Sequence, residues 1–208
     1  MLKTYLLLID RDLRAEEQES YMRFIAADSR ERVKKFRRAA DARRALLGEV
    51  LTARIAGGSP GETPARTDYG KPYIPGRPGF HFNRSHAGRY VALAVDDEPV
   101  GIDVEEISRA RPEIAGRFFA ADETEYIFSR PAAERARAFC LVWTMKESYV
   151  KREGRGLVMP LASFSVFGAE AVFFHEITCG PDAICHVCTS KSAPPQEIFL
   201  TLDGLARC

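Results

Sequence analysis

The sequence predicts a mixed α/β protein built from two halves that each combine strands with helices. In the first half, residues 2–9 form an apolar run of strand length, and residues 42–55 carry apolar side chains at helical spacing. In the second half, a long helical segment precedes several short apolar runs that are typical of strands. We therefore expect an N-terminal α/β half at residues 1–100 and a C-terminal α/β half at residues 101–208.

Local patterns predict the elements of the first half. The run at 2–9 is too short to cross a membrane and no cleavage site follows it, so we expect a buried strand. Three helices should follow. The first spans 16–27, the second is basic and has Ser29 as its N-cap, and the third spans 42–55 with Asp41 as its cap. The glycine-rich segment 57–61 should end the last of them.

Turn residues and short apolar runs organise the rest of the chain. Residues 63–79 are rich in proline and glycine and predict a surface loop with at most one short strand. The strand at 90–95 leads into a turn at 96–99, so we expect a hairpin that returns through 100–104. The second half should hold helices at 112–119, after Asp122 and at 132–151, and strands at 164–167, 172–174, 184–187 and 197–202.

Bulk properties exclude several classes of protein. With 208 residues, of which 46% are apolar, the chain has ample material for a core. A net charge of +1 argues against a general nucleic-acid or membrane binder. The five cysteines, an odd number without an export signal, argue against a disulfide framework and favour the cytoplasm.

The segment Cys185-His186-Val187-Cys188 superficially suggests a zinc site. The same segment has the character of a strand, which would put its two cysteines on opposite sides. Because no second cysteine pair completes a site, we interpret them as buried strand cysteines.

Four charged residues form two pairs that each share one face. Asp103 and Glu105 are two apart in an apolar strand, and Glu147 and Lys151 are four apart in a helix. Brought together, they offer three carboxylates to a hard cation, with an ammonium group beside it. This set suits a metal-bound phosphate ester and favours magnesium over zinc. The simpler explanations are a polar edge strand and an ion pair on a helix surface.

Basic residues elsewhere suggest contacts to phosphate. His86, after Ser85, can donate a hydrogen bond to a phosphate oxygen, although a lone histidine is more often structural. Residues 30–44 carry eight arginines and lysines against two acids, which suits a phosphate monoester or an acidic partner, or else a solvated helix face. The segment lacks interleaved aromatics, which argues against single-stranded nucleic acid. Lys71 is either a further phosphate ligand or an ordinary turn lysine.

Taken together, these segments resemble the surfactin-synthetase-type 4′-phosphopantetheinyl transferases over nearly the whole chain. The residues that carry the resemblance are Ala42-Arg43-Arg44-Ala45-Leu46-Leu47-Gly48, Gly70-Lys71-Pro72, Phe82-Asn83-Arg84-Ser85-His86, Gly101-Ile102-Asp103-Val104-Glu105, Arg117-Phe118-Phe119 leading to Glu123, Trp143-Thr144-Met145-Lys146-Glu147-Ser148-Tyr149-Val150-Lys151, and Gly154-Arg155-Gly156-Leu157. The segment Gly101-Ile102-Asp103-Val104-Glu105 alone would be a weak signal, whereas all of these segments in this order and spacing are highly specific.

The resemblance implies a pseudo-two-fold pair of α/β halves, the 4′-phosphopantetheinyl transferase fold, with the active site in the cleft between them. It implies coenzyme A as the donor. The phosphopantetheine arm would move to a serine hydroxyl of an apo acyl or peptidyl carrier protein, with release of adenosine 3′,5′-bisphosphate. Pyrophosphate cleavage mainly needs charge neutralisation and alignment, which the acids and basic residues named above would supply.

The same resemblance assigns the catalytic and metal residues. Asp103, Glu105 and Glu147 match the ligands of Mg²⁺, and Glu147 also matches a base toward the serine. Lys151 matches a contact to the coenzyme's phosphates. Glu123 matches an acid near the metal whose role varies among members, so Glu147, Lys151 and Glu123 are the expected catalytic residues.

The remaining matches concern coenzyme A. Ser85 and His86 match contacts to its phosphates, together with Lys151. Arg44 and Lys71 match ligands of the nucleotide end, and Arg32 falls where the family places a basic residue for the 3′-phosphate.

Two other functions stay open at this point. A non-catalytic homologue would bind coenzyme A or a carrier protein without turnover, and a magnesium-dependent nucleotide pyrophosphatase would use water in place of the serine. We expect a cytoplasmic monomer that binds neither nucleic acid nor membrane.

Overall fold

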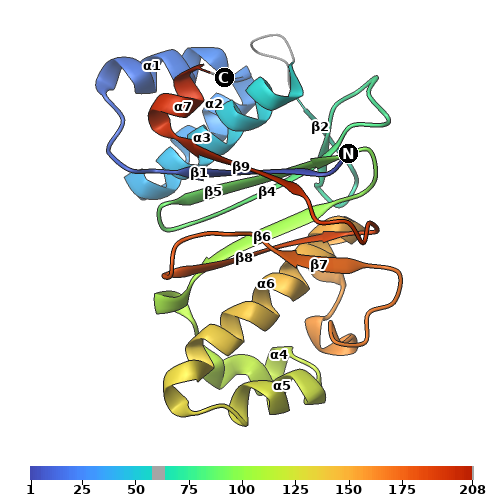
Figure 1. The fold of residues 1–208 in the computed structure, drawn as a ribbon. Coiled ribbons are helices and arrows are strands. Elements are labelled where there is room, and N and C mark those ends of the chain that lie inside the picture. Colours follow the sequence, from blue (N-terminus) through green and yellow to red (C-terminus); the bar gives the residue numbers. More distant parts are fainter. Residues whose placement is uncertain (58–63, 208) are drawn as a thin grey trace.

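Two β-sheets pack face to face, and helices cover the outer side of each (Figure 1). The computed structural model describes residues 1–57 and 64–207. The first sheet has the order β4-β5-β1-β9, formed by His81–Ala87, Tyr90–Asp96, Lys3–Leu8 and Gln196–Thr201. The second has the order β6-β8-β7, formed by Gly101–Glu106, Ala183–Thr189 and Phe173–Glu176. A short pair, β2 (Ala65–Arg66) and β3 (Pro72–Tyr73), stands apart.

The helices divide between the two sheets. The first sheet carries α1 (Ala15–Phe24), α2 (Ala27–Lys34), α3 (Ala39–Ala56) and α7 (Leu202–Arg207), and the second carries α4 (Ala115–Phe118), α5 (Ala121–Phe128) and α6 (Arg135–Glu153). Short 3₁₀ turns lie at Ile107–Arg109, Pro112–Ile114, Ala132–Glu134, Gly156–Val158 and Leu161–Ser163. Within the described ranges, no helix is long and apolar enough to span a bilayer.

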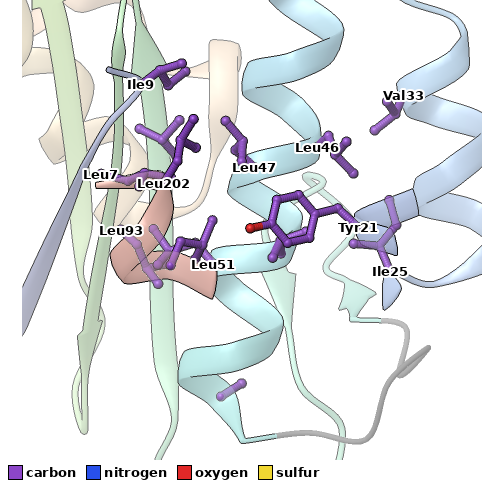
Figure 2. Packing of buried hydrophobic residues seen from close by; sticks show 14 of the residues in the cluster. Leu7, Ile9, Tyr21, Ile25, Val33, Leu46, Leu47, Leu51, Leu93 and Leu202 are labelled. Carbon is purple, nitrogen blue, oxygen red and sulfur yellow. The ribbon is translucent and has the colours of Figure 1, made fainter. Parts of the chain in front are cut away.

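Strand alternation builds separate cores on the two faces of the first sheet. In β1, Leu6 packs between the sheets, whereas its neighbour Leu7 faces the helices. Figure 2 shows Leu47 and Leu51, one turn apart on α3, packed on this outer face. Both leucines are fully buried, and each such burial contributes roughly 1.5–3 kcal/mol. The helices therefore pack on the outer face of the sheet whose edge strand is β4.

The two halves repeat one topology, as the predicted pair of similar α/β halves requires. Each runs from a strand through helices to an antiparallel strand pair, so that the orders β4-β5-β1 and β7-β8-β6 correspond. The division expected at residue 100 separates the two sheets, except that β9 and α7 lie with the first one. β9 pairs with β1 in parallel, and it therefore fastens the end of the chain to its beginning.

Most predicted strands and helices are confirmed, but the hairpin expected at residues 90–104 is wrong. β6 pairs with β8 of the other sheet, not with β5. The backbone N–H of Ile102 instead donates to the side-chain oxygen of Asn83 at 2.9 Å, so β6 lies beside β4 without joining its ladder. This contact places the edge of one sheet next to the edge of the other, where the site described below forms.

Three predicted helix caps and one predicted strand are also wrong. Ser29, Asp41 and Asp122 all lie inside their helices rather than at the cap position. Residues 164–167 form no strand, because their backbone groups bind side chains instead: the carbonyl of Phe164 accepts from Lys146 at 2.6 Å. The glycine-rich break is confirmed only at Gly57, which ends α3 with φ of 61°, since 58–61 lie outside the described residues.

The buried strand cysteines are confirmed. Cys185 and Cys188 both lie in β8 and are fully buried. They belong to opposite faces, since Cys185 packs between the sheets with Val187, whereas the alternate Ile184 faces the helices of the second sheet. Both cysteines are therefore packing residues of the core.

Candidate active site

β6 turns two acids toward α6. Ile102 and Val104 point into the core between the sheets, so that the alternating side chains of Asp103 and Glu105 face the helix. Gly101, on the same face, has no side chain and lets the backbone of α6 pack directly on the strand. As a result, Glu147 and Lys151 of α6 lie beside the acids of β6.

A compact set of contacts joins three elements at Asp103. The Lys151 ammonium lies 2.5 Å from Asp103 Oδ1 and 3.1 Å from Ser85 Oγ. Ser85, on β4, donates to the same Oδ1 at 2.7 Å. Asp103 is buried, and Lys151 keeps 27% of its side chain exposed. The strand β4, the strand β6 and the helix α6 thus converge on one carboxylate.

The acids carry more negative charge than Lys151 offsets. Asp103 Oδ2 is buried, and the described residues offer it no hydrogen-bond partner. Burial raises the pKa of Glu105 to about 7, and the charge of Asp103 adds to this rise. Burial followed by the charge of Asp103 also raises the pKa of Glu147. The carboxylates of Glu105 and Glu147 therefore lie within electrostatic reach of Asp103. Among the described residues, no group of three or more His, Cys, Asp or Glu side chains is already arranged to hold a metal ion.

Two cavities open on this cluster. One of about 420 Å³ is lined by Glu105, His86 and Arg44, and also by Trp143 and other apolar side chains. The second, of about 280 Å³, is lined by Glu147 and Lys151 among others. Acids of the cluster therefore line two cavities, which suits an extended substrate.

Two predicted phosphate contacts lie in the larger cavity. Arg44 is held there by Asp41 and by the carbonyl oxygen of Gly88, at 2.9 Å. Partial burial lowers the pKa of His86 below its usual value, and the positive charges of Arg44 and Lys151 add to this effect. His86 is therefore neutral at pH 7 and keeps one ring N–H as a donor.

Lys71 lies in the smaller cavity, so the structure does not bring it together with Arg44. Its ammonium donates to the carbonyl oxygens of Val100 at 3.2 Å and Arg152 at 2.8 Å. Burial lowers the pKa of Lys71 to about 8, and the nearby charge of Arg152 adds to this effect. The ammonium thus ties the start of β6 to the last turn of α6.

Two further predicted residues, Arg32 and Glu123, have contacts to partners other than the three acids. Arg32 contacts Glu49 on α3 and Ser29 Oγ, the latter at 3.2 Å. Glu123 is completely buried and pairs at 2.8 Å with Lys146, which is buried as well. The contacts of Glu123 are thus to Lys146 and to backbone groups, and its expected position near the metal stays a prediction.

The contacts of Glu123 explain its position. One carboxylate oxygen accepts from the backbone N–H of Ala120 and the other from that of Val166, both at 2.8 Å. These bonds cap α5 and hold the loop that follows α6. Glu123 has the environment of a structural ion pair.

Two residues of the site had no role in the sequence analysis. Asn83 holds β6 against β4 through the bond to Ile102 described above. Arg109 lines the larger cavity and lowers the pKa of Glu105 against the effect of burial. Arg109 comes only a few residues after the acids of β6. This change from negative to positive charge along the chain is the sequence signal that indicates Arg109.

Comparison with known proteins agrees with this geometry. Residues 99–202 match the model of the 4′-phosphopantetheinyl transferase superfamily, and residues 13–98 match that of the N-terminal part of 4′-phosphopantetheinyl transferases. The first match begins just before β6 and covers the acids and α6. The second covers the helices and strands of the first sheet that carry Arg44, Ser85 and His86.

Individual relatives extend the similarity to most of the chain. The 4′-phosphopantetheinyl transferase Sfp of Bacillus subtilis strain 168 is 41% identical over 79% of this chain and 76% of its own. The 4′-phosphopantetheinyl transferase psf-1 of Bacillus pumilus is 36% identical over 93% and 92%, respectively. The 4′-phosphopantetheinyl transferase HetI of a Nostoc species is 31% identical over 68% and 66%. The chain therefore belongs to the 4′-phosphopantetheinyl transferase superfamily and is an enzyme of phosphopantetheine transfer.

Proposed function

We propose that this enzyme moves the 4′-phosphopantetheine arm of coenzyme A to a serine hydroxyl of an apo acyl or peptidyl carrier protein. The reaction uses Mg²⁺ and releases adenosine 3′,5′-bisphosphate. The supporting observation is the buried Asp103, which binds Lys151 and Ser85 through one oxygen while its other oxygen has no partner among the described residues. Glu105 and Glu147 flank it within electrostatic reach.

The chemistry of the three carboxylates fits a hard divalent cation. A cation held by Asp103, Glu105 and Glu147 would satisfy the unpartnered oxygen of Asp103. It would also offset the repulsion from Asp103, which adds to burial in raising the pKa values of Glu105 and Glu147. Oxygen ligands, without thiolate or imidazole, favour Mg²⁺ over zinc. When bound, Mg²⁺ supplies neutralisation of the diphosphate and of the departing bisphosphate.

The protein's own donors orient the diphosphate. Lys151 is partly exposed beside both Asp103 and Ser85, so its ammonium can turn to a phosphate oxygen without leaving the site. His86 donates a ring N–H from the larger cavity, and Arg44 adds a positive charge that Asp41 and Gly88 hold in place. Phosphoryl transfer requires this alignment and neutralisation more than covalent help from the protein.

Glu147 is our proposed base. The serine hydroxyl must lose its proton as it attacks phosphorus, and a carboxylate oxygen of Glu147 accepts it. Glu147 lines the same cavity as Lys151, so the proposed base and the proposed phosphate contact share one cavity. Lys151, one turn further along α6, stays beside the phosphate and stabilises the charge that develops there.

We propose supporting roles for the other predicted residues. The stem of Lys71 lines the smaller cavity as part of the nucleotide site, while its ammonium fastens β6 to α6. Arg32 contacts the 3′-phosphate of coenzyme A. Glu123 supports the fold and takes no part in the chemistry, as its full burial and its ion pair with Lys146 indicate.

The assembly and compartment follow from the same observations. Because the two α/β halves of one chain together supply the proposed site, we propose a monomer, which sedimentation would test. The four cysteines that the structure describes are free thiols, which fits the reducing cytoplasm where coenzyme A and carrier proteins occur.

Mass spectrometry of carrier proteins tests the proposal. The purified enzyme is mixed with coenzyme A, Mg²⁺ and a panel of apo carrier proteins, and we expect one phosphopantetheine to be added to at least one of them. The mixture without carrier serves as the control, because bisphosphate release there would indicate a pyrophosphatase. Binding of coenzyme A without any modified carrier would indicate a non-catalytic homologue and would contradict the proposal.

A further inference from the structure

An amide lies among apolar side chains in the layer between the two sheets. Asn83 is the only asparagine in the sequence, and the structure buries it. Side chains alternate along β4, so Asn83 and Ala87 share the face that packs between the sheets. The residue opposite Asn83 on β5 is the fully buried Ala94 of the same layer. An amide buried there costs free energy unless its polar groups find partners.

The partner of this amide is the backbone of β6, which is an edge strand of the second sheet. Ile102 donates its backbone N–H to Asn83 Oδ1 at 2.9 Å. The carbonyl oxygen of Ile102 accepts from the ammonium of Lys151 at 3.4 Å. One residue of β6 is therefore held by β4 through its N–H and by α6 through its carbonyl oxygen.

The contact between Asn83 and Ile102 lies next to the contact between Ser85 and Asp103. Ser85 follows Asn83 by two residues and shares its face of β4, while Asp103 directly follows Ile102. The hydroxyl of Ser85 donates to Asp103 Oδ1 at 2.7 Å. Apolar packing is non-directional, so the layer between the sheets does not by itself prevent β6 from shifting along β4. A hydrogen bond has a preferred length and angle, and a buried polar contact can therefore fix a register.

We infer that Asn83 is a positioning residue for phosphopantetheine transfer. Its hydrogen bond to Ile102 sets the register of β6 against β4, and this register places Asp103 where Ser85 and Lys151 reach it. Asn83 acts through the backbone of β6 and not through contact with the substrate. The inference rests on the proposed function for the reaction whose rate Asn83 changes.

The test separates kcat from KM in two variants of Asn83. Asn83→Leu removes the acceptor oxygen and keeps a side chain of similar size. We expect kcat per folded molecule to fall roughly ten- to a hundredfold, the range for a displacement of about 1 Å at a reacting centre. KM for coenzyme A should change little, because Arg44 and His86 keep their places in the larger cavity. Asn83→Asp keeps an acceptor oxygen at the same position and should restore part of kcat.

Thr4→Val is the matched control for removing a polar group from the first sheet. Thr4 is buried in β1, and its hydroxyl has no hydrogen-bond partner among the described residues. Because valine has nearly the same shape and no bond is lost, kcat should stay at the wild-type value. Wild-type kcat per folded molecule in Asn83→Leu would show a purely structural role and overturn the inference. Asn83 also lines the smaller cavity, so a raised KM with unchanged kcat would indicate direct contact with the donor and would overturn it as well.

Amide hydrogen exchange of the free enzyme makes the register test independent of turnover. We expect the N–H of Ile102 to exchange at least about tenfold faster in Asn83→Leu than in wild type, and to keep its protection in Asn83→Asp. The amides of α5, in the second half, serve as the internal reference and should exchange at the wild-type rate. If wild type modified no carrier protein, the proposed function would fail. Unchanged exchange at Ile102 in Asn83→Leu would instead refute the role of Asn83 in setting the register.

Discussion

The backbones of Gly101 and Ser148 lie so close that no side chain fits between them. A Cβ atom at Gly101 would lie 2.0 Å from the carbonyl oxygen of Ser148 and 2.4 Å from the backbone nitrogen of Arg152. Both of these are backbone atoms of α6 and cannot move as a flexible side chain would. This contact sets the distance between β6, which carries Asp103, and the helix that carries Lys151.

Replacing Gly101→Ala should therefore damage both stability and transfer. Overpacking against a fixed backbone costs about 1–3 kcal/mol, and the displaced helix should draw Lys151 away from Asp103. Urea unfolding measures the first effect, and kcat of the folded enzyme measures the second. Gly116→Ala is the control, because nothing lies within 4 Å of a Cβ there, and it should be tolerated. Equal activity of the two variants would contradict this account of the site.

The acid cluster and its helix were predictable because both depend on short-range periodicity. Side chains two apart on a strand, and four apart on a helix, share a face wherever those elements form. Asp103 and Glu105 therefore had to point together, as did Glu147 and Lys151. The same local logic predicted β1 and α3 from their apolar residues.

Other features depend on partners distant in the chain, and local patterns do not contain them. β6 pairs with β8, about eighty residues away, although the turn at 96–99 suggests a hairpin with β5. The carboxylate of Glu123 finds Lys146 and the backbone of Val166 only after the second half has folded. The resemblance matched Glu123 by its position in the chain and therefore did not predict these contacts.

Removing divalent metal should abolish transfer. We expect chelation by EDTA to stop the reaction and Mg²⁺ to restore it, because the three acids then lack their counterion. Mg²⁺ should also raise the melting temperature of wild type, since a ligand at a hundred times its Kd stabilises by about 2.7 kcal/mol. Asp103→Asn should lose at least about a hundredfold in kcat and most of this thermal shift. A shift of wild-type size in Asp103→Asn would place the metal elsewhere.

The metal-free enzyme should lose stability as the pH rises toward neutrality. The pKa of Glu105 is about 7 in the folded protein against an ordinary value of 4.5, because burial and Asp103 disfavour its charge. The folded state thus binds more protons than the unfolded state between these values, and stability falls from about pH 4.5 to about pH 7. The loss should be on the order of 1–2 kcal/mol, with allowance for solvent screening.

Glu105→Gln isolates this effect. Urea unfolding in EDTA at several pH values should show a flatter profile for the variant than for wild type, and greater stability near pH 7. Glu113→Gln, at an exposed acid on the same half, is the control and should keep the wild-type profile. If Glu105→Gln and wild type lost stability in parallel, Glu105 would not be the group responsible.

Glu123→Gln should destabilise the protein while leaving the chemistry intact. Glu123 and Lys146 are both fully buried, so the substitution leaves an ammonium group in the interior without its counterion. Breaking a buried pair in this way costs about 3–5 kcal/mol. The double variant Glu123→Gln with Lys146→Met removes the unpaired charge and should recover part of that loss. Transfer is measured at low temperature and divided by the folded fraction, and we expect a value close to wild type. A Glu123→Gln protein that is as stable as wild type but inactive would restore Glu123 to the catalytic residues.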